Sequence, residues 1–196
     1  WQHHQKVSYC LYGSKRHMTI EIFNSSSKPF YRFGQLMFLR KIDETEWIKF
    51  IMNSFQRTGK EISTEDAGLI VEKVKSHSWY VQQLSHFVWS ATRKAVTVEI
   101  VDKAFSQIVN TNLPLYVAEC EALSITQLNL LIAIAKGESI LTGATTMSKY
   151  KLGTPQNVSK NKIVLEQKDI LDKTVEGFYF LDPVFEFWFK SEYVDG

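Results

Sequence analysis

The sequence predicts a mainly α-helical protein with the remnant of an α/β core at its start, a helical bundle in its middle and a winged helix at its end. Three observations predict this order: a strand-like apolar run opens the chain, four amphipathic helices follow, and a helical segment with a β-hairpin closes it. The 196 residues can bury a real core. The longest apolar run falls far short of the roughly 20 residues of a membrane span. Composition and the two cysteines, Cys10 and Cys120, favour a cytoplasmic protein with reduced thiols and no membrane partner.

The first segment has the pattern of a strand followed by a helix. Residues 7–12 are β-branched and aromatic, Gly13-Ser14 ends the run, and 15–23 has helical spacing. A strand this apolar needs partners on both sides, so we expect the other strands of its sheet to lie upstream of Trp1. Residues 1–41 carry seven Lys or Arg and one acid, against a net charge of −4 in the rest. Such a basic block can meet phosphates, an acidic neighbouring domain, or only solvent.

Residues 43–109 predict four short helices that pack as a bundle. The first begins at Asp43 with Glu46 as a capping box and stops at Thr58-Gly59, and the second begins at Ser63. The third covers 77–93, and the fourth begins at Thr97 and is expected to break at 110–114. Apolar residues at helical spacing line one side of each helix, as in most core-forming helices.

The last third predicts a winged helix. Helices are expected at 124–136, 144–152 and 154–168, the last with Thr154 as its cap and Pro155 in the favoured first position. Two strand-like runs, 170–175 and 177–181, then form a hairpin. Asp182-Pro183 begins a final aromatic helix that we expect to pack back on the domain.

The sequence lacks the motifs of a complete enzyme. Its only Gly-Lys pair, Gly59-Lys60, is followed by Glu61 and has no preceding glycine of a phosphate loop. Cys-x-x-Cys, His-Glu-x-x-His and Gly-x-Ser-x-Gly are also missing. We therefore expect that this chain by itself holds no cofactor and no metal and does not bind and hydrolyse ATP.

Several segments, in order and spacing, resemble archaeal-type AAA/STAND P-loop ATPases, a family also found in bacteria. Residues 9–18 resemble the segment that follows the Walker B strand. The agreement continues at 28–33, 79–84, 123–127, 134–137 and 182–188. The resemblance implies three parts: the C-terminal end of an ATPase core at 1–41, a helical lid bundle at 42–118 and a winged-helix domain at 119–196.

The resemblance also implies nucleotide-dependent roles. The longer protein would be an ATPase that uses ATP and Mg²⁺, and its upstream core would be the partner of this chain. Ser14 and Arg16 match positions that face the γ-phosphate, which makes them candidate nucleotide sensors, although Ser14 also suits a helix cap. The family's lid carries Gly-x-Pro against adenine, whereas this sequence has Ser76-His77-Ser78, which leaves adenine contact by this lid in question.

Two functions follow from these parts. In the first, the chain is the C-terminal part of an ATP-dependent switch, and its winged helix docks on the core or on a protein partner. In the second, the winged helix is a DNA-binding regulatory module that places helix 154–168 in the major groove. The candidate DNA contacts are Lys149, Lys151, Gln156, Asn157, Ser159, Lys160 and Lys162. Segment 139–173 has six Lys and three acids, a light basic excess that favours docking.

Overall fold

The computed structural model describes residues 6–13, 22–24, 26–28, 30–31, 35, 37, 39–174 and 177–195. The chain divides into two compact units, Trp1–Arg40 and Lys41–Gly196. In the first unit, residues 7–12 are exposed and lie outside any strand, with Tyr12 95% exposed. The predicted strand is therefore not formed in this chain, because the described part of this unit offers no neighbouring strand to cover it. Of the predicted helix 15–23, only 22–23 fall within the described residues, and both are helical.

The second unit begins with three helices: α2 (Glu44–Gln56), α3 (Thr64–Lys73) and α4 (Ser78–Ala91). Ser63 caps α3 as predicted, since its hydroxyl accepts a hydrogen bond from the Asp66 backbone N–H at 2.9 Å. The predicted capping box at Asp43 is wrong. Asp43 occupies the cap position without a side-chain hydrogen bond, and the Glu46 carboxylate instead pairs with Lys49, one turn further along, at 2.8 Å.

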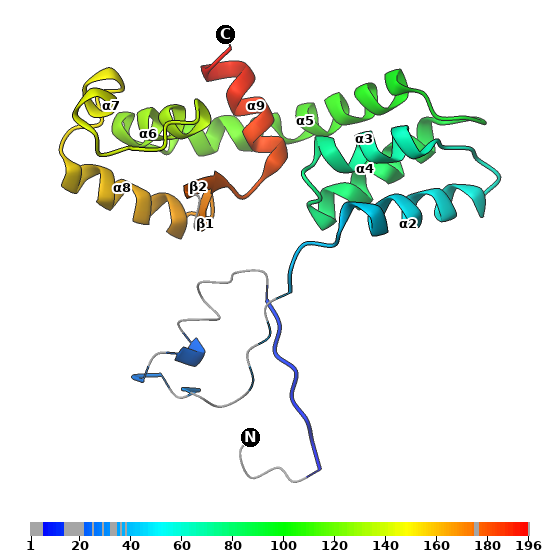
Figure 1. Cartoon of the computed structure of the whole chain (residues 1–196), viewed down its shortest axis with the longest axis horizontal. Coiled ribbons are helices and arrows are strands. Elements are labelled where there is room, and N and C mark those ends of the chain that lie inside the picture. Colours follow the sequence, from blue (N-terminus) through cyan, green and yellow to red (C-terminus); the bar gives the residue numbers. More distant parts are fainter. Residues whose placement is uncertain are drawn as a thin grey trace. The chain divides into compact units, whose positions relative to one another are not determined.

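The helix α5 (Val98–Glu121) is longer than predicted and passes straight through Pro114. The expected break at 110–114 is wrong: proline removes one backbone donor and crowds the carbonyl four residues before it, but the turns beyond it bury Tyr116 and Cys120. Burial of those side chains keeps the helix continuous. As a result α5 extends from the bundle into the C-terminal elements (Figure 1).

The C-terminal elements follow the predicted winged-helix order. They are α6 (Ile125–Ala135), α7 (Ala144–Lys149), α8 (Pro155–Gln167), β1 (Leu171–Thr174), β2 (Gly177–Phe180) and α9 (Pro183–Tyr193). The two strands form an antiparallel hairpin in which Leu171 faces Phe180. Thr154 caps α8, with Pro155 in the first turn. The predicted mainly helical fold with a terminal winged helix is confirmed.

Three helix ends carry a left-handed residue that is not glycine. Lys75, Lys151 and Asp169 follow α3, α7 and α8 with φ of 48°, 53° and 57°. Each sits in the turn that closes a helix by a hydrogen bond from the next residue to a carbonyl five positions back, as from Ser76 N–H to Val71 at 3.0 Å. A side chain in this conformation costs about 1 kcal/mol or more, which glycine avoids.

One hydrophobic core runs through the second unit. Buried apolar side chains form a single cluster from Trp47 in α2 to Phe189 in α9. The bundle and the winged helix therefore share a core along α5. Within the described residues, no helix combines the length and the apolar character needed to cross a bilayer.

Candidate functional sites

The predicted DNA-contact residues of α8 lie on its open face. Gln156, Asn157, Ser159 and Lys160 are all exposed, while the opposite side of the helix buries Val158, Asn161 and Leu165. The Asn161 amide donates to the Thr126 hydroxyl at 3.2 Å and so joins α8 to α6. This face also carries Ile163, which is 54% exposed and which sequence reasoning did not single out. Helical spacing was the signal that could have identified it, because Ile163 follows Gln156 and Lys160 on the same side of the helix.

Of the three remaining predicted contacts, Lys149 and Lys162 have partners within the fold, and Lys151 is exposed like Lys160. Lys149 pairs with Glu138 at 2.8 Å, and this carboxylate raises the pKa of the Lys149 ammonium. Lys162 lies with its ammonium 5.1 Å from the centre of the Phe178 ring in the hairpin, where burial lowers its pKa. Lys151 is exposed but occupies the left-handed position after α7. The structure thus gathers these side chains around α8 without forming a strong basic surface.

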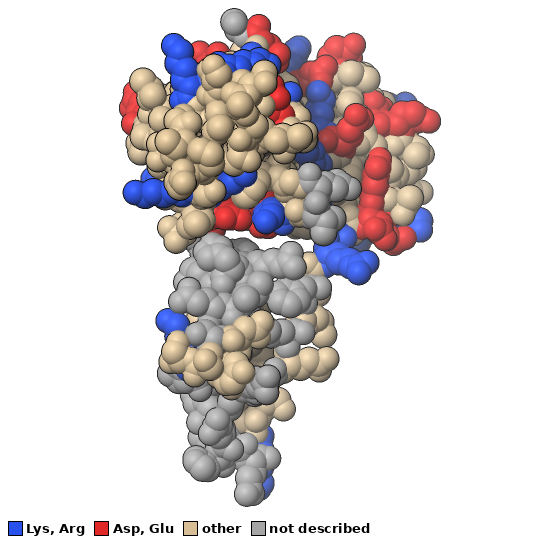
Figure 2. Space-filling model, turned by 60° about the vertical axis from the view of Figure 1, so that its left-hand side comes forward, with Lys and Arg blue, Asp and Glu red and all other residues tan. Residues whose placement is uncertain are grey.

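The space-filling view also shows few positive charges on the winged helix. In Figure 2 the end of the second unit that comes forward, formed by the winged helix, is largely uncharged, with Lys and Arg side chains at its margins and acidic side chains among them. Nucleic-acid binders usually concentrate cations over the contact face. The α8 face therefore combines amide, hydroxyl and isoleucine side chains with few available cations.

A second polar cluster joins the helical bundle to the winged helix, and we call it the junction: Lys75, Tyr80, Tyr116, Asp182 and Glu186. The Asp182 carboxylate caps α9 by accepting from the backbone N–H groups of residues 184 and 185 at 2.8 and 2.9 Å. Its other oxygen accepts from the Tyr80 hydroxyl of α4 at 2.6 Å. The Tyr116 hydroxyl of α5 lies 3.3 Å from that of Tyr80. Burial, with the carboxylate beside them, raises the pKa of both tyrosines, so they stay protonated donors.

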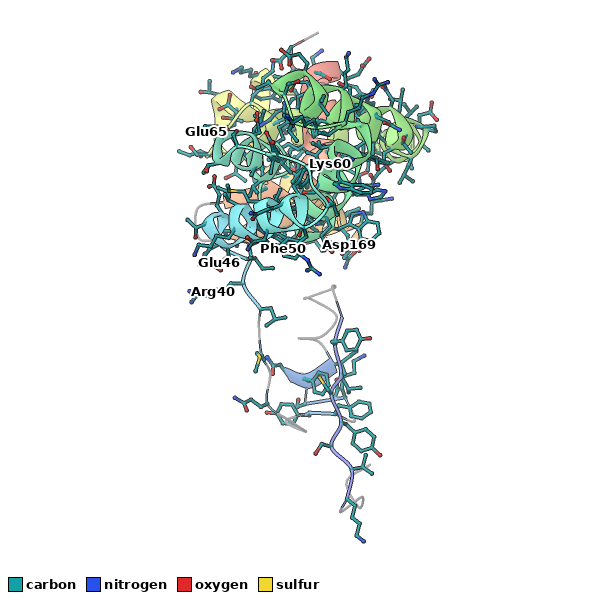
Figure 3. The ribbon with its side chains drawn as sticks, turned by 90° about the vertical axis from the view of Figure 1, so that its right-hand side faces the viewer. Arg40, Glu46, Phe50, Lys60, Glu65 and Asp169 are labelled. Atoms are coloured by element: carbon teal, nitrogen blue, oxygen red, sulfur yellow. The ribbon has the colours of Figure 1, made fainter. Side chains whose placement is uncertain are left out.

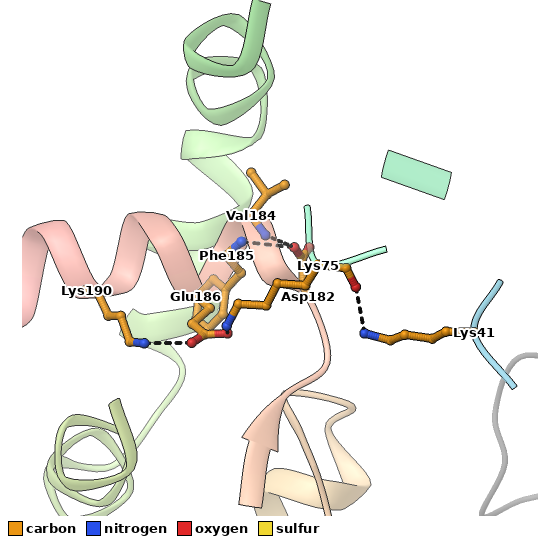
Figure 4. A network of polar contacts seen from close by, with 7 residues as sticks. All are labelled: Lys41, Lys75, Asp182, Val184, Phe185, Glu186 and Lys190. Atoms are coloured by element: carbon orange, nitrogen blue, oxygen red, sulfur yellow. Dashed lines mark hydrogen bonds and ion pairs between the residues drawn. The ribbon is translucent and has the colours of Figure 1, made fainter. Parts of the chain in front are cut away.

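The other half of the junction is an ion-paired carboxylate. Glu186 of α9 has a side chain only 10% exposed and lies between the ammonium groups of Lys75, at 2.6 Å, and Lys190, at 2.7 Å (Figure 4). Burial alone would raise the pKa of Glu186, but the two lysine hydrogen bonds outweigh it and hold the pKa below its usual range. Lys75 reaches it from the turn between α3 and α4, so this pair crosses from bundle to winged helix.

The same turn receives a contact from the segment that enters α2. The Lys41 ammonium donates to the Lys75 backbone carbonyl at 2.8 Å. A cavity of about 160 Å³ lies beside these groups, lined by Lys41, Lys75 and Glu186 and by the hairpin residues 178–181. Next along the turn, the His77 ring packs on Tyr80 with centroids 5.1 Å apart, and burial lowers the pKa of His77.

Sequence reasoning missed the junction, although one signal was present. Glu186 interrupts the aromatic helix 184–189, and a carboxylate among buried aromatics needs a cationic partner. The partner, Lys75, is 111 positions away and could not be paired with it by spacing. The candidate sensors Ser14 and Arg16 lie outside the described residues. In the part of the chain that is described, no group of His, Cys, Asp and Glu could hold a metal ion.

Comparisons with known proteins agree with the fold. A family model described as "Probable winged helix domain" matches residues 114–191, which include the end of α5 and most of α9. The Walker-type ATPase PABY2304 of Pyrococcus abyssi has a similar structure, with a TM-score of 0.63 and 16% sequence identity. The match covers 89% of this chain and 49% of that chain, so this chain spans about half of its length. A search of curated proteins gave no significant match.

These matches establish the architecture. The C-terminal part of the chain is a winged-helix domain. At 16% identity the structural likeness concerns the fold, and it extends beyond the winged helix into the helical bundle, because it covers 89% of the chain. The chain thus resembles part of a Walker-type ATPase that carries a winged-helix domain.

Proposed function

We propose that this chain is the C-terminal part of an ATP-dependent switch, in which α2–α5 form the lid of an ATPase core and the winged helix docks on the core or on a protein partner. The observation that carries the proposal is the junction. A hydrogen bond of 2.6 Å from Tyr80 to Asp182 and an ion pair of 2.6 Å from Lys75 to Glu186 join lid to winged helix. Tyr116 of the shared helix α5 belongs to the same cluster, so a rotation of the lid would carry the winged helix with it.

Exposed aromatics on the bundle support a docking surface for the core. Phe50 of α2 is 55% exposed and Trp79 of α4 is 67% exposed, on two helices that contact each other. Figure 3 shows Phe50 on the outer side of α2. Large exposed aromatic side chains of this kind are typical of protein interfaces.

In this proposal ATP and Mg²⁺ belong to the upstream core. The described residues include no metal-binding cluster, and the sequence has no phosphate loop, so no catalytic step is assigned to this chain. Titration of chain 1–196 with Mg-ATP in a calorimeter is expected to give no measurable heat of binding. A micromolar dissociation constant would contradict the proposed division of roles.

The switch itself is tested in the longer natural protein that carries the core. Hydrogen exchange of α8 and α9, measured with and without ATP, should differ between the two states. The double variant Tyr80→Phe, Asp182→Asn should lose this difference and keep its ATP affinity, because it weakens the connection between lid and winged helix, while asparagine at this position can still cap α9. Glu46→Gln, which alters an exposed pair on α2, is the matched control. An ATP response that persists in the double variant would refute transmission through the junction.

Ser14 and Arg16 keep their proposed role as nucleotide sensors. If Arg16 meets charge that develops in the transition state, Arg16→Ala in the longer protein should lower ATP turnover more than ATP affinity. Unchanged turnover would leave Arg16 as one cation of the basic block.

DNA binding is the second candidate function, favoured by the hydrogen-bonding side chains of the α8 face. Fluorescence anisotropy of chain 1–196 with a random duplex at low salt distinguishes the two. Docking predicts no tight binding. DNA recognition predicts that the logarithm of the binding constant falls with the logarithm of the salt concentration, with a slope near −0.9 per phosphate contact. Lys160→Ala should then weaken DNA binding, and Lys103→Ala on α5 should change it little.

A further inference from the structure

The turn between α3 and α4 holds two consecutive residues in the left-handed region. Lys75 has a φ of 48° and Ser76 a φ of 55°, and neither is glycine. Hydrogen bonds from the Lys75 and Ser76 N–H groups to the Glu72 and Val71 carbonyls, at 2.9 and 3.0 Å, contribute to this conformation. Such backbone persists only where neighbouring contacts hold it, and it is a common feature of segments that exist in two states.

Two contacts from outside the turn converge on Lys75. The Lys41 ammonium binds its backbone carbonyl at 2.8 Å, and its own ammonium binds Glu186 at 2.6 Å (Figure 4). Lys41 belongs to the short segment that leads into α2, and Glu186 lies on α9. The backbone and side chain of one residue therefore connect the entry of the bundle to the winged helix.

We propose that Lys75 is a latch: while Lys41 is bound to its carbonyl, the turn keeps Glu186 and α9 docked, and release of Lys41 loosens α9 from the bundle. This inference rests on the proposed function, because it names the residues through which movement at the entry of the lid would reach the winged helix.

The physical basis is the balance of charge and strain at the turn. Two ammonium groups lie close to one carboxylate, and both burial and the neighbouring Lys75 lower the pKa of Lys41. The Lys41 ammonium donates to a neutral carbonyl, whereas Lys75 and Lys190 pair with a carboxylate, so the Lys41 contact is the weakest of the three. Without it, the Lys75 carbonyl can rotate, the left-handed pair can relax, and the side chain of Lys75 moves away from Glu186. His77 moves with the turn, and its ring packs on Tyr80, the donor to Asp182.

Hydrogen exchange of chain 1–196, measured without nucleotide, tests the latch. Lys41→Met keeps the apolar stem and removes the ammonium. It is expected to speed the exchange of the α9 amides roughly tenfold, as the loss of a charge-assisted hydrogen bond would, and to leave α8 unchanged. Lys49→Met on α2, which loses only an exposed pair with Glu46, is the matched control. Unchanged α9 exchange in Lys41→Met overturns the proposal, and so does equal acceleration in α8.

A double-mutant cycle separates a latch from a general loosening. If Lys41 acts on α9 through Lys75 and Glu186, Lys41→Met should add little once Glu186→Gln has removed the carboxylate. Effects that simply add would show that Lys41 stabilises α9 by another route, and this would overturn the latch. Because these measurements need no ATP, their failure would leave the ATP-dependent switch of the longer protein standing.

Discussion

At the scale of single residues, two carboxylates determine where α9 packs. Glu186 is a carboxylate inside an aromatic helix, and its two lysine partners keep it ionised. The Asp182 carboxylate caps α9 and also accepts hydrogen bonds from the hydroxyl groups of Tyr80 in α4 and Tyr116 in α5. Because the buried Glu186 and the partly buried Asp182 both accept hydrogen bonds from other elements, these residues specify how α9 packs on the bundle.

Glu186→Gln should lower stability at neutral pH by about 1–3 kcal/mol, because two ammonium groups lose their anion. The pKa of Glu186 lies below that of an unfolded glutamate, about 4.3, so its contribution is present above that pH and is lost as the pH falls through the folded pKa. The difference between wild type and variant should therefore shrink below pH 4. Urea unfolding of both proteins at pH 7 and pH 3.5 measures this difference in the free energy of unfolding. Glu46→Gln, whose pair is exposed, should change stability by less than about 0.5 kcal/mol.

Lys151→Gly should stabilise the fold by about 1 kcal/mol, because glycine adopts the left-handed φ of 53° without steric cost. Lys151→Ala removes the same ammonium but keeps a Cβ, so it should give no gain. Thermal unfolding of both variants provides the comparison. Equal stability of the two variants would mean that the backbone at this position is not strained.

At the scale of elements, α5 is the connection on which the fold depends. It packs with α3 and α4 of the bundle and with α9, and its Phe105 and Tyr116 rings both contact aromatic rings of α9. Pro114 lies in the second half of α5 and cannot donate a backbone hydrogen bond to the Asn110 carbonyl. Packing of the buried side chains on either side compensates for that loss.

Pro114→Ala should raise the free energy of unfolding by about 1–3 kcal/mol, because it restores the missing donor within a helix that is already formed. Pro114 is exposed, so the substitution removes little packing. Guanidinium unfolding followed by circular dichroism measures the change. A less stable variant would instead show that α5 needs the geometry imposed by proline to reach both of its neighbours.

At the scale of the whole molecule, residues 41–196 form a single compact unit in which bundle and winged helix share one core. We therefore expect bundle and winged helix to unfold together. In native-state hydrogen exchange, the most protected amides of α3 and of α6 should open with the same free energy. Two separate free energies would mean that the junction and α5 couple the two parts only weakly.

The sequence by itself determined the elements and their order. Local signals are strong where a cap, an apolar period and a stop residue agree, as at Ser63 for α3 and at Thr154-Pro155 for α8. They also predicted the hairpin, because two short aromatic and β-branched runs flank Gly177. They did not predict the continuation of α5 past Pro114, because proline opposes a helix locally and only packing on distant side chains keeps it.

Only the tertiary structure decided the junction and the availability of the lysines around α8. Glu186 and Lys75 are 111 positions apart, and the pairing of two such charges depends on how α9 meets the turn after α3. Lys149, Lys160 and Lys162 were all predicted to contact DNA, yet the fold places Glu138 against Lys149 and Phe178 against Lys162. The spacing of residues along a helix shows which side of the helix each one faces. The partners of a charged side chain, however, come from segments that the fold brings close to it, and those partners determine what the side chain can bind.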